Sequence, residues 1–354
     1  MTDEEMLQRV VGALAAGPTE LSGFRKGGRL LLGIPRQAEA ARRTLGLYQP
    51  QRPAARVMTG IFRILADRGL HHRFLPGLSV SPSTASVIPE LAGIEPATRG
   101  VLLGSPEHKV RRAVATYRNH GAWEVAKIAL GDKGHAILAS EAHALGGIHP
   151  FTDAVPRLLG IHRCEDLTIM RMPYLSGTPL DSSGISGVLG LLESWKRDLP
   201  RQRADQFDEW PAIERALSVS PEGRMLVPEI QSLMLQPMIR HGDFARWNLL
   251  RNADGSITAL DWEWGHPAAM PGLDLVHYFL QDQRLVRRLP HSKAIAATLV
   301  RMRETRSFSL FRETGWPDDP MLPVIASLAY KQGAGHQENS AVLSAALSLW
   351  AAAR

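Results

Sequence analysis

Apolar positions follow two different patterns along the chain. Short apolar runs with the character of strands lie at residues 29–35, 123–130 and 166–177, the last running into a connector that contains Pro and Gly. Residues 77–96, with repeated Pro, Ser and Gly, predict a connecting segment. Apolar residues spaced three or four apart, which predict amphipathic helices, occupy residues 4–16, 54–70, 137–145, 184–196, 210–217, 228–235, 322–331 and 340–353. The pattern therefore predicts an α+β protein in which helices dominate the second half.

A β-hairpin is predicted at residues 249–260. Two apolar residues are followed there by the turn sequence Asn-Ala-Asp-Gly and by a second β-rich run. The polar residues Asp243 and Asn248 precede this hairpin, and Asp261 follows it. Because a hairpin reverses the chain, we expect Asp261 to lie beside the loop that carries Asp243 and Asn248.

The polar residues around this hairpin have the spacing of a known catalytic loop. Asn248 and Asp261 follow Asp243 as in the protein-kinase pattern His-x-Asp-x-x-x-x-Asn and the metal-binding triplet after it. Residues 241–243 read His-Gly-Asp where protein kinases have His-Arg-Asp, and residues 261–263 read Asp-Trp-Glu where they have Asp-Phe-Gly. With these substitutions the sequence resembles the aminoglycoside phosphotransferase and choline kinase-like family, whose members are small-molecule kinases built on the protein-kinase fold.

The resemblance implies ATP-dependent phosphoryl transfer to a hydroxyl group. It implies that Asp243 positions the hydroxyl and takes its proton, while Asn248 and Asp261 hold Mg²⁺ on the nucleotide phosphates. His241 belongs to the same catalytic loop and is expected to brace it rather than to transfer protons. Asp274 resembles a trailing aspartate of the family that serves as a further brace. Taken one at a time, each of these residues is also an ordinary turn or cap residue.

A lysine in a predicted strand is the second feature that the resemblance explains. Lys127 lies within the run Trp-Glu-Val-Ala-Lys-Ile-Ala-Leu, which is similar to the Val-Ala-Ile-Lys strand of kinases. A lysine among apolar strand residues is costly unless its ammonium group meets an anion. Glu141, on the helix predicted over residues 137–145, and nucleotide phosphates would supply that anion. The alternative is an edge-strand lysine that reaches water and a glutamate on a solvated helix face.

Two further segments correspond to weaker landmarks of the family. Gly104 and Ser105 occupy the place of the phosphate-covering hairpin, although the Gly-x-Gly-x-x-Gly pattern is missing from this stretch of the sequence. Met172 and Tyr174 occupy the place of the hinge between the lobes, where backbone groups would meet adenine. The alternative for this second segment is a strand and a turn without a ligand.

The composition is typical of a soluble enzyme. Apolar residues make up 44% of the 354 residues, and no run approaches the roughly 18 apolar residues of a membrane span. The first residues are acidic, whereas a secretory signal begins with basic residues. The single cysteine, Cys164, excludes an internal disulfide and a cysteine-based metal site. We therefore expect a cytoplasmic protein without a membrane span.

The net charge of +6 bears on the choice of partner. The sequence has no zinc-finger or other nucleic-acid signature, so we expect no nucleic-acid partner, and a polyanion-binding module remains an alternative. The segment after Asp274, where the family builds its acceptor pocket, contains more Arg than Asp and Glu. Because such a surface repels a polycation, we expect a small hydroxyl acceptor (a sugar, amino alcohol or glycolipid-like molecule) rather than a polycationic aminoglycoside.

The chain is expected to have three parts. Residues 1–95 form an accessory module of unknown role, residues 96–173 a nucleotide-binding N-lobe, and residues 174–354 a catalytic and acceptor-binding C-lobe. The expected fold is α+β and protein-kinase-like, with an antiparallel-sheet N-lobe and a mainly helical C-lobe. The main functional alternative is a catalytically silent kinase fold that binds a nucleotide or a partner. A protein kinase is disfavoured, because the His-Arg-Asp arginine and an Ala-Pro-Glu segment are missing from the sequence.

Overall fold

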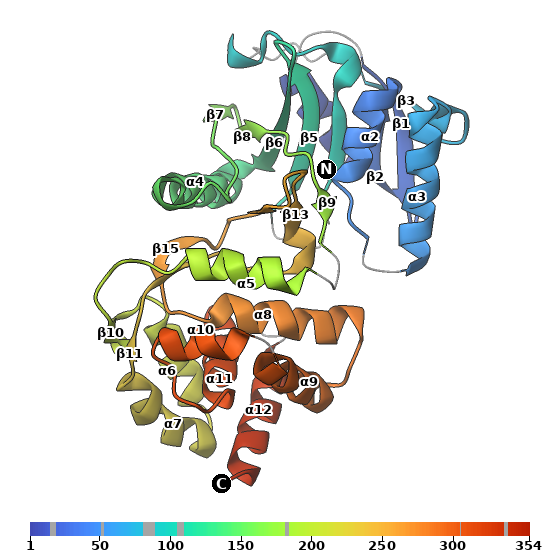
Figure 1. The fold of residues 1–354 in the computed structure, drawn as a ribbon. Coiled ribbons are helices and arrows are strands. Elements are labelled where there is room, and N and C mark those ends of the chain that lie inside the picture. Colours follow the sequence, from blue (N-terminus) through green and yellow to red (C-terminus); the bar gives the residue numbers. More distant parts are fainter. Residues whose placement is uncertain are drawn as a thin grey trace. The chain divides into compact units, whose positions relative to one another are not determined.

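The chain divides into two compact units in the computed structural model (Figure 1). The sheet unit contains Met1–His143 and Pro156–Leu175, and the helical unit contains Ala144–Val155 and Ser176–Arg354. The residues that the structure describes are 1–14, 19–50, 53–80, 89–104, 110–180, 184–304, 306–335 and 339–354. One unit is built on an antiparallel sheet and the other is mainly helical, which confirms the predicted fold class.

The sheet unit is built on eight antiparallel strands in the order β3-β1-β2-β4-β5-β6-β8-β7. β6 lies inside this sheet, where Lys127 is paired with Val114 of β5 on one side and with Met170 of β8 on the other. The strands are β1 (Thr19–Lys26), β2 (Arg29–Pro35), β3 (Gly77–Val80), β4 (Gly100–Leu103), β5 (Arg112–Asn119), β6 (Ala122–Leu130), β7 (Gly160–Cys164) and β8 (Leu167–Pro173).

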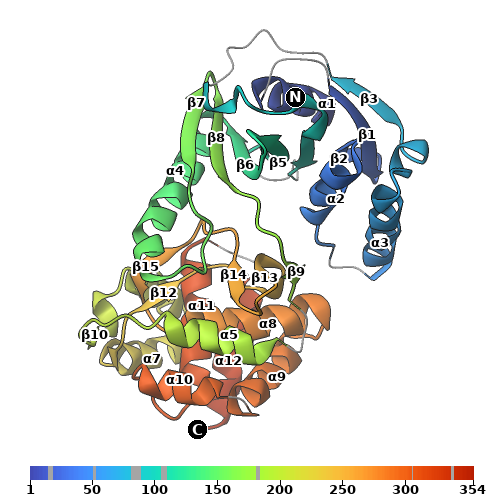
Figure 2. The ribbon, with the colours of Figure 1, turned by 45° about the horizontal axis from the view of Figure 1, so that its top comes forward.

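Helices cover both faces of this sheet (Figure 2). Gly33 of β2 faces α1, because a Cβ atom there would lie 3.1 Å from the Leu7 side chain. Its neighbours Leu32 and Ile34 are buried instead with Leu45 of α2. Since successive strand residues point to opposite faces, α1 and α2 lie on opposite sides of the sheet. The longer helices that begin in this unit are α1 (Asp3–Leu14), α2 (Ala38–Gly46), α3 (Pro53–Asp67) and α4 (Gly131–Ile148).

Residues 1–95 do not form a separate compact unit. The sequence predicts a boundary near residue 95, yet β2 on one side of it pairs with β4 on the other, Leu32 with Leu102 and Gly33 with Val101. Hydrogen bonds between strands far apart in the sequence determine where the compact unit ends. The apolar pattern of each strand alone does not reveal these hydrogen bonds. The second predicted boundary, after residue 173, lies next to the end of the sheet unit at Leu175. The role of the first segment stays a prediction.

The helical unit combines eight helices of seven or more residues with short strands, among its described residues. Its helices are α5 (Ile185–Ser194), α6 (Trp210–Leu217), α7 (Pro221–Gln231), α8 (Leu273–Gln281), α9 (His291–Glu304), α10 (Ser307–Glu313), α11 (Met321–Gly333) and α12 (Ser340–Ala352). Its strands are β9 (Thr178–Pro179), β10 (Gln202–Arg203), β11 (Met234–Leu235), β12 (Met238–Arg240), β13 (Leu249–Arg251), β14 (Ile257–Ala259) and β15 (His266–Ala269).

Single helical turns connect several of these elements. Seven such segments are His71–Arg73, Pro89–Leu91, Pro96–Thr98, His149–Phe151, Ala204–Gln206, Arg246–Asn248 and the π-helical Asp282–Val286. The last of them continues α8 without a break. In the described part of the chain, no helix is both long enough and apolar enough to cross a membrane.

The core of the helical unit lies around α11. Every residue of this helix from Met321 to Ala329 is buried, and the helix packs against α6, α8 and α12. The predicted hairpin is confirmed as β13 and β14, with Leu249 paired to Ala259 and Arg251 to Ile257. The segment between β12 and β13, which carries the predicted catalytic residues, contacts α8, α11 and Leu260 just after the hairpin.

Candidate active site

The loop between β12 and β13 depends on a glycine at its start. Gly242 has φ = 84°, in the left-handed region where glycine is favoured. A Cβ atom at this position would lie 2.4 Å from Cβ of Trp264 and 2.7 Å from its carbonyl oxygen. The loop therefore passes too close to Trp264 for any side chain. This explains why the sequence reads His-Gly-Asp and has no arginine at the central position.

Asp274 holds the loop in place from the first turn of α8. Its Oδ2 accepts a hydrogen bond of 2.6 Å from the His241 backbone N–H, and its Oδ1 accepts one of 2.9 Å from the Gly242 N–H. The Asp274 side chain is buried, so both bonds form away from water and are stronger than they would be at the surface. The predicted role of Asp274 as a brace is confirmed.

His241 is a second brace. Its Nε2–H donates to the Leu260 carbonyl at 2.6 Å, and its Nδ1 accepts from the Asp243 backbone N–H at 3.2 Å. The ring is fully buried against Trp262, with centroids 4.7 Å apart, and against Phe244. Because both ring nitrogens are used inside the protein, His241 supports the loop and is not positioned to carry a proton to a substrate.

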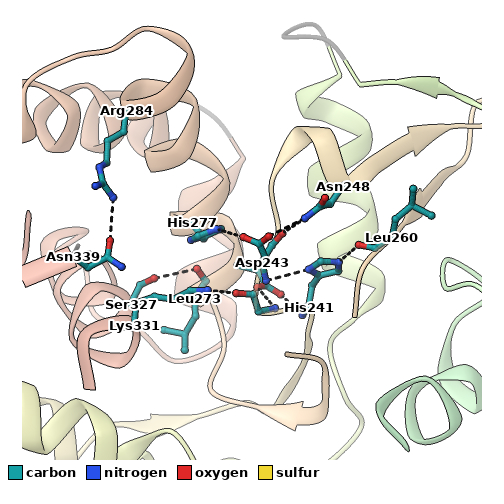
Figure 3. Close-up of polar contacts among 12 residues, drawn as sticks. His241, Asp243, Asn248, Leu260, Leu273, His277, Arg284, Ser327, Lys331 and Asn339 are labelled. Carbon is teal, nitrogen blue, oxygen red and sulfur yellow. Dashed lines mark hydrogen bonds and ion pairs between the residues drawn. The ribbon is translucent and has the colours of Figure 1, made fainter. Parts of the chain in front are cut away.

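Three side chains meet at the end of this loop (Figure 3). Asn248 Nδ2 donates to the Asp243 carbonyl at 2.9 Å and to Asp243 Oδ2 at 3.0 Å. His277, from α8, lies with Nε2 2.9 Å from Asp243 Oδ1. Each oxygen of the Asp243 carboxylate therefore has a partner from a different element, which fixes the direction of the carboxylate. The Asp243 side chain remains 38% exposed and can still meet a ligand.

The surroundings of Asp243 keep it ionised. Burial acts to raise the pKa of Asp243, but the hydrogen bond from His277 and the positive charge of Lys331 outweigh it and hold the pKa well below its usual range. Burial is also the largest influence on His277 and lowers its pKa below the usual 6.5. At neutral pH, therefore, a neutral imidazole donates its N–H to a carboxylate. Lys331 of α11 donates to the Gly242 carbonyl and adds positive charge beside this pair.

His277 and Lys331 are contacts of the site that sequence reasoning missed. His277 follows Asp274 by three positions in one helix, a spacing that puts the two side chains on the same face, and this signal could have found it. Lys331 is 89 residues away from the glycine that it contacts, and no motif links the two. Its position depends on the packing of α11 against α8.

Asn248 and Asp261 come close through the hairpin, as the sequence predicts. The Leu260 N–H donates to the Asn248 carbonyl at 2.7 Å, so the residue before Asp261 is bonded to the loop. Asp261 itself has φ = 68°, a left-handed conformation that Asp adopts more readily than most residues other than glycine.

Asn248 and Asp261 offer the kind of atoms that magnesium prefers. Asn248 Nδ2 is turned to Asp243, so its Oδ1 lies on the other side of the amide group. An amide oxygen and a carboxylate suit Mg²⁺, which binds few protein groups and completes its shell with phosphate oxygens and water. No group of three or more His, Cys, Asp or Glu side chains within the described ranges could hold a metal ion. Asn248 and Asp261 are two protein groups that a magnesium site shared with phosphate oxygens could use.

The sheet unit contains the predicted lysine–glutamate pair. Lys127 of β6 and Glu141 of α4 form an ion pair, with Nζ 2.5 Å from Oε1. Glu141 is buried at 2% exposure, while Lys127 keeps 18% of its side chain exposed. A buried carboxylate needs such a partner, because removing an unpaired charge from water costs several kcal/mol. The pair is confirmed; its contact with nucleotide phosphates stays a prediction.

Three of the remaining predicted nucleotide contacts, Gly104, Met172 and Tyr174, lie at or near strand ends. Gly104 follows β4, and its N–H donates to the Arg112 carbonyl at 2.8 Å. Ser105 lies outside the described residues. Met172 is buried within β8. The Tyr174 N–H donates to the Trp123 carbonyl at 2.9 Å, so this N–H belongs to the sheet and is not available to adenine. The other expected adenine contacts stay predictions.

Comparisons with known proteins give structural likenesses only. No protein-family model matches the chain, and no curated protein matches it. An aminoglycoside phosphotransferase APH(4)-Ia mutant is 14% identical with a TM-score of 0.43 over 70% of this chain and 92% of that one. Choline kinase LicA from Streptococcus pneumoniae is 14% identical with a TM-score of 0.42 over 66% and 89%.

A third solved structure covers more of the chain. Ethanolamine kinase from Plasmodium vivax is 12% identical with a TM-score of 0.45, over 88% of this chain and 92% of that one. At these identities and TM-scores, the assignment of a function to this chain rests on its own residues.

Proposed function

We propose that the chain is a small-molecule kinase that transfers the γ-phosphate of ATP to a hydroxyl group. The observation that carries this proposal is the Asp243 carboxylate, which His277 and Asn248 hold from two sides while 38% of it stays exposed. An aspartate with a purely structural role needs no exposed part. An aspartate that orients a substrate needs both a fixed direction and access.

Asp243 acts on the acceptor. Its lowered pKa keeps it a carboxylate, so it accepts a hydrogen bond from the acceptor hydroxyl and aims the oxygen at the γ-phosphorus. As the new oxygen–phosphorus bond forms, the bond from the γ-phosphorus to the bridging oxygen breaks and ADP leaves. The hydroxyl proton passes to the carboxylate. In a loose transition state this transfer comes late, so a weakly basic carboxylate suffices.

The nucleotide would be bound through a lysine and a magnesium ion. Lys127, held by Glu141, has the charge to bind phosphate oxygens. Asn248 Oδ1 and the Asp261 carboxylate would hold Mg²⁺, which neutralises charge on the transferred group when it is bound. The ion pair leaves Lys127 18% exposed, and the amide of Asn248 presents its oxygen away from Asp243.

The acceptor would be neutral or anionic in the part that approaches Asp243. Lys331 donates to the loop at Gly242 and places a positive charge near Asp243. This cation would oppose the approach of a polycationic aminoglycoside, and a sugar or glycolipid-like hydroxyl would not be repelled. An amino alcohol with one positive charge stays within the proposal if its charge lies away from this side.

The test is acceptor-dependent ADP release. The protein is incubated with ATP and magnesium across a panel of sugars, amino alcohols, glycolipid head groups and aminoglycosides, beside an Asp243→Asn variant. We expect turnover with at least one acceptor and a loss of about 100-fold or more in the variant, the usual size of an acid–base contribution. Nucleotide affinity should change little. Wild-type turnover in the variant would refute the role of Asp243, and no magnesium-dependent ATP binding by the wild type would refute the kinase itself.

A further inference from the structure

Helix α3 of the sheet unit has an apolar face that is exposed. Val57, Met58, Ile61 and Ile64, here called the α3 stripe, are 48–66% exposed and lie on successive turns of one side of the helix. The opposite side holds the helix to the unit through Phe62. Its ring meets Phe24 edge-on with centroids 5.4 Å apart.

The α3 stripe is not part of the fold's own core. α3 lies beside α2 at the rim of the sheet unit in both ribbon views (Figures 1 and 2). Phe74, which follows α3 after one short turn, is a further apolar side chain with 65% exposure. Soluble proteins rarely expose several large apolar side chains on consecutive helical turns, and such patches mark interaction surfaces.

The charge around the α3 stripe indicates what kind of partner surface the stripe would bind. Residues 36–74 contain eight arginines and only two acidic residues. Both acids are already paired, Glu39 with Arg43 at 2.9 Å and Asp67 with Arg42 at 3.8 Å. The segment therefore has a large positive excess. Its exposed arginines include one just before the stripe and two just after it, namely Arg56, Arg68 and Arg73.

We propose that the α3 stripe docks on an anionic membrane surface. The apolar side chains would enter the boundary between head groups and acyl chains, while the arginines bind lipid phosphates. This combination of an apolar face with flanking arginines is typical of helices that lie in the membrane interface. Docking of this kind needs no membrane-spanning helix.

A second copy of the chain fits this surface less well. Two copies related by a two-fold axis would bring the same patch of each into contact. Arg56 and Arg68 of one copy would then lie near those of the other, and repulsion between like charges would oppose the contact. An anionic lipid layer supplies both the apolar medium and the opposite charge.

Vesicle binding tests the proposal without relying on any catalytic activity. The full chain is sedimented with vesicles of an equal mixture of phosphatidylcholine and phosphatidylglycerol, and with vesicles of phosphatidylcholine alone. We expect binding to the mixed vesicles only. The double variant Val57→Ser, Ile61→Ser should bind about tenfold less, because two large apolar side chains no longer leave water. Replacing Arg68 by Gln should weaken binding about fivefold.

A matched control distinguishes binding through the α3 stripe from nonspecific binding of exposed apolar side chains to vesicles. Val219 and Met225 of the helical unit are 75% and 66% exposed, and their double replacement by Ser should leave vesicle binding unchanged. Circular dichroism confirms that each variant is folded. The proposal is overturned if the wild type binds neither vesicle, or if the α3 double variant binds as well as the wild type. It is also overturned if the wild type self-associates in sedimentation velocity and only the α3 double variant does not.

Discussion

His277 and Asp243 form a hydrogen bond of 2.9 Å that joins α8 to the candidate catalytic loop. The same helix supplies Asp274, which accepts two backbone hydrogen bonds from this loop. One helix therefore helps to fix both the position of the loop and the direction of its carboxylate. Because its pKa is lowered, the Asp243 carboxylate is a weak base. It is therefore better suited to orienting a hydroxyl group by a hydrogen bond than to removing the proton early in the reaction.

Replacing His277 tests this guidance. In His277→Leu, Asp243 loses one partner, and we expect kcat to fall about 100-fold, as is usual when a reacting group is misplaced. The KM for ATP should change little, since His277 acts through Asp243. The pKa of Asp243 should rise, so the acidic limb of the pH–rate profile moves to higher pH. His277→Gln keeps an N–H near the position of Nε2 and should recover most of the activity. Equal losses in both variants would point to a purely structural role.

The pH dependence of stability follows from the same pair. The pKa of His277 is lowered by burial, so the unfolded chain binds this proton more readily than the folded chain. The stability contribution is therefore complete above the usual pKa of 6.5 and is lost as the pH falls through the lower folded-state value. Burial acts to raise the pKa of Asp243, but His277 and nearby cations hold it below 3.8. Its contribution is present above that value and is lost in stronger acid.

Urea unfolding at a series of pH values measures this contribution. We expect the free energy of unfolding to decrease as the pH falls below 6.5 in the wild type, and to decrease less in His277→Gln. His71 is buried and its pKa is lowered by burial as well, so part of the decrease remains in the variant. Identical pH profiles in the two proteins would show that His277 does not change its affinity for protons on folding.

A comparison of alanine substitutions at two glycines distinguishes the cost of backbone strain from the cost of a steric clash. Gly242 and Gly255 both have φ = 84°, but a Cβ atom would meet Trp264 at 2.4 Å in the first case and nothing within 4 Å in the second. Gly255→Ala should cost about 1 kcal/mol from the left-handed backbone alone. Gly242→Ala should cost at least about 2 kcal/mol more and lower the activity, because the loop must move. Equal free energies of unfolding in the two variants would contradict the close approach to Trp264.

The sequence reveals some of these relationships and hides others. The hairpin and the lysine strand could be predicted, because turn residues and β-rich runs are local signals. The contact of His277 could also have been predicted, because His277 lies three positions after Asp274 in the same helix. Lys331 was not, since its contact with Gly242 depends on how α11 packs against α8. The sheet unit extends past the predicted boundary near residue 95 for a similar reason. The pairing of β2 with β4 joins segments whose own patterns do not indicate partners.

Variants of the Lys127–Glu141 pair should separate its effect on the free energy of unfolding from its effect on the affinity for ATP. In Lys127→Met, the buried Glu141 loses its partner, and the free energy of unfolding should fall by about 3 kcal/mol. The double variant Lys127→Met, Glu141→Leu removes both charges and should recover much of that loss, because no unpaired charge stays buried. Both variants should bind ATP at least about tenfold more weakly, as each lacks the ammonium group for the phosphates.

The surface pair between Lys196 and Glu313, 2.7 Å apart and well exposed, supplies the matched control. Lys196→Met should change neither unfolding nor nucleotide binding appreciably, since an exposed ion pair contributes less than about 1 kcal/mol. Calorimetric titration with ATP and magnesium gives the affinities, and urea unfolding gives the stabilities. If the double variant Lys127→Met, Glu141→Leu is as stable as the wild type and still binds ATP normally, the pair has no role in nucleotide binding. Loss of binding in that stable variant assigns Lys127 to the nucleotide.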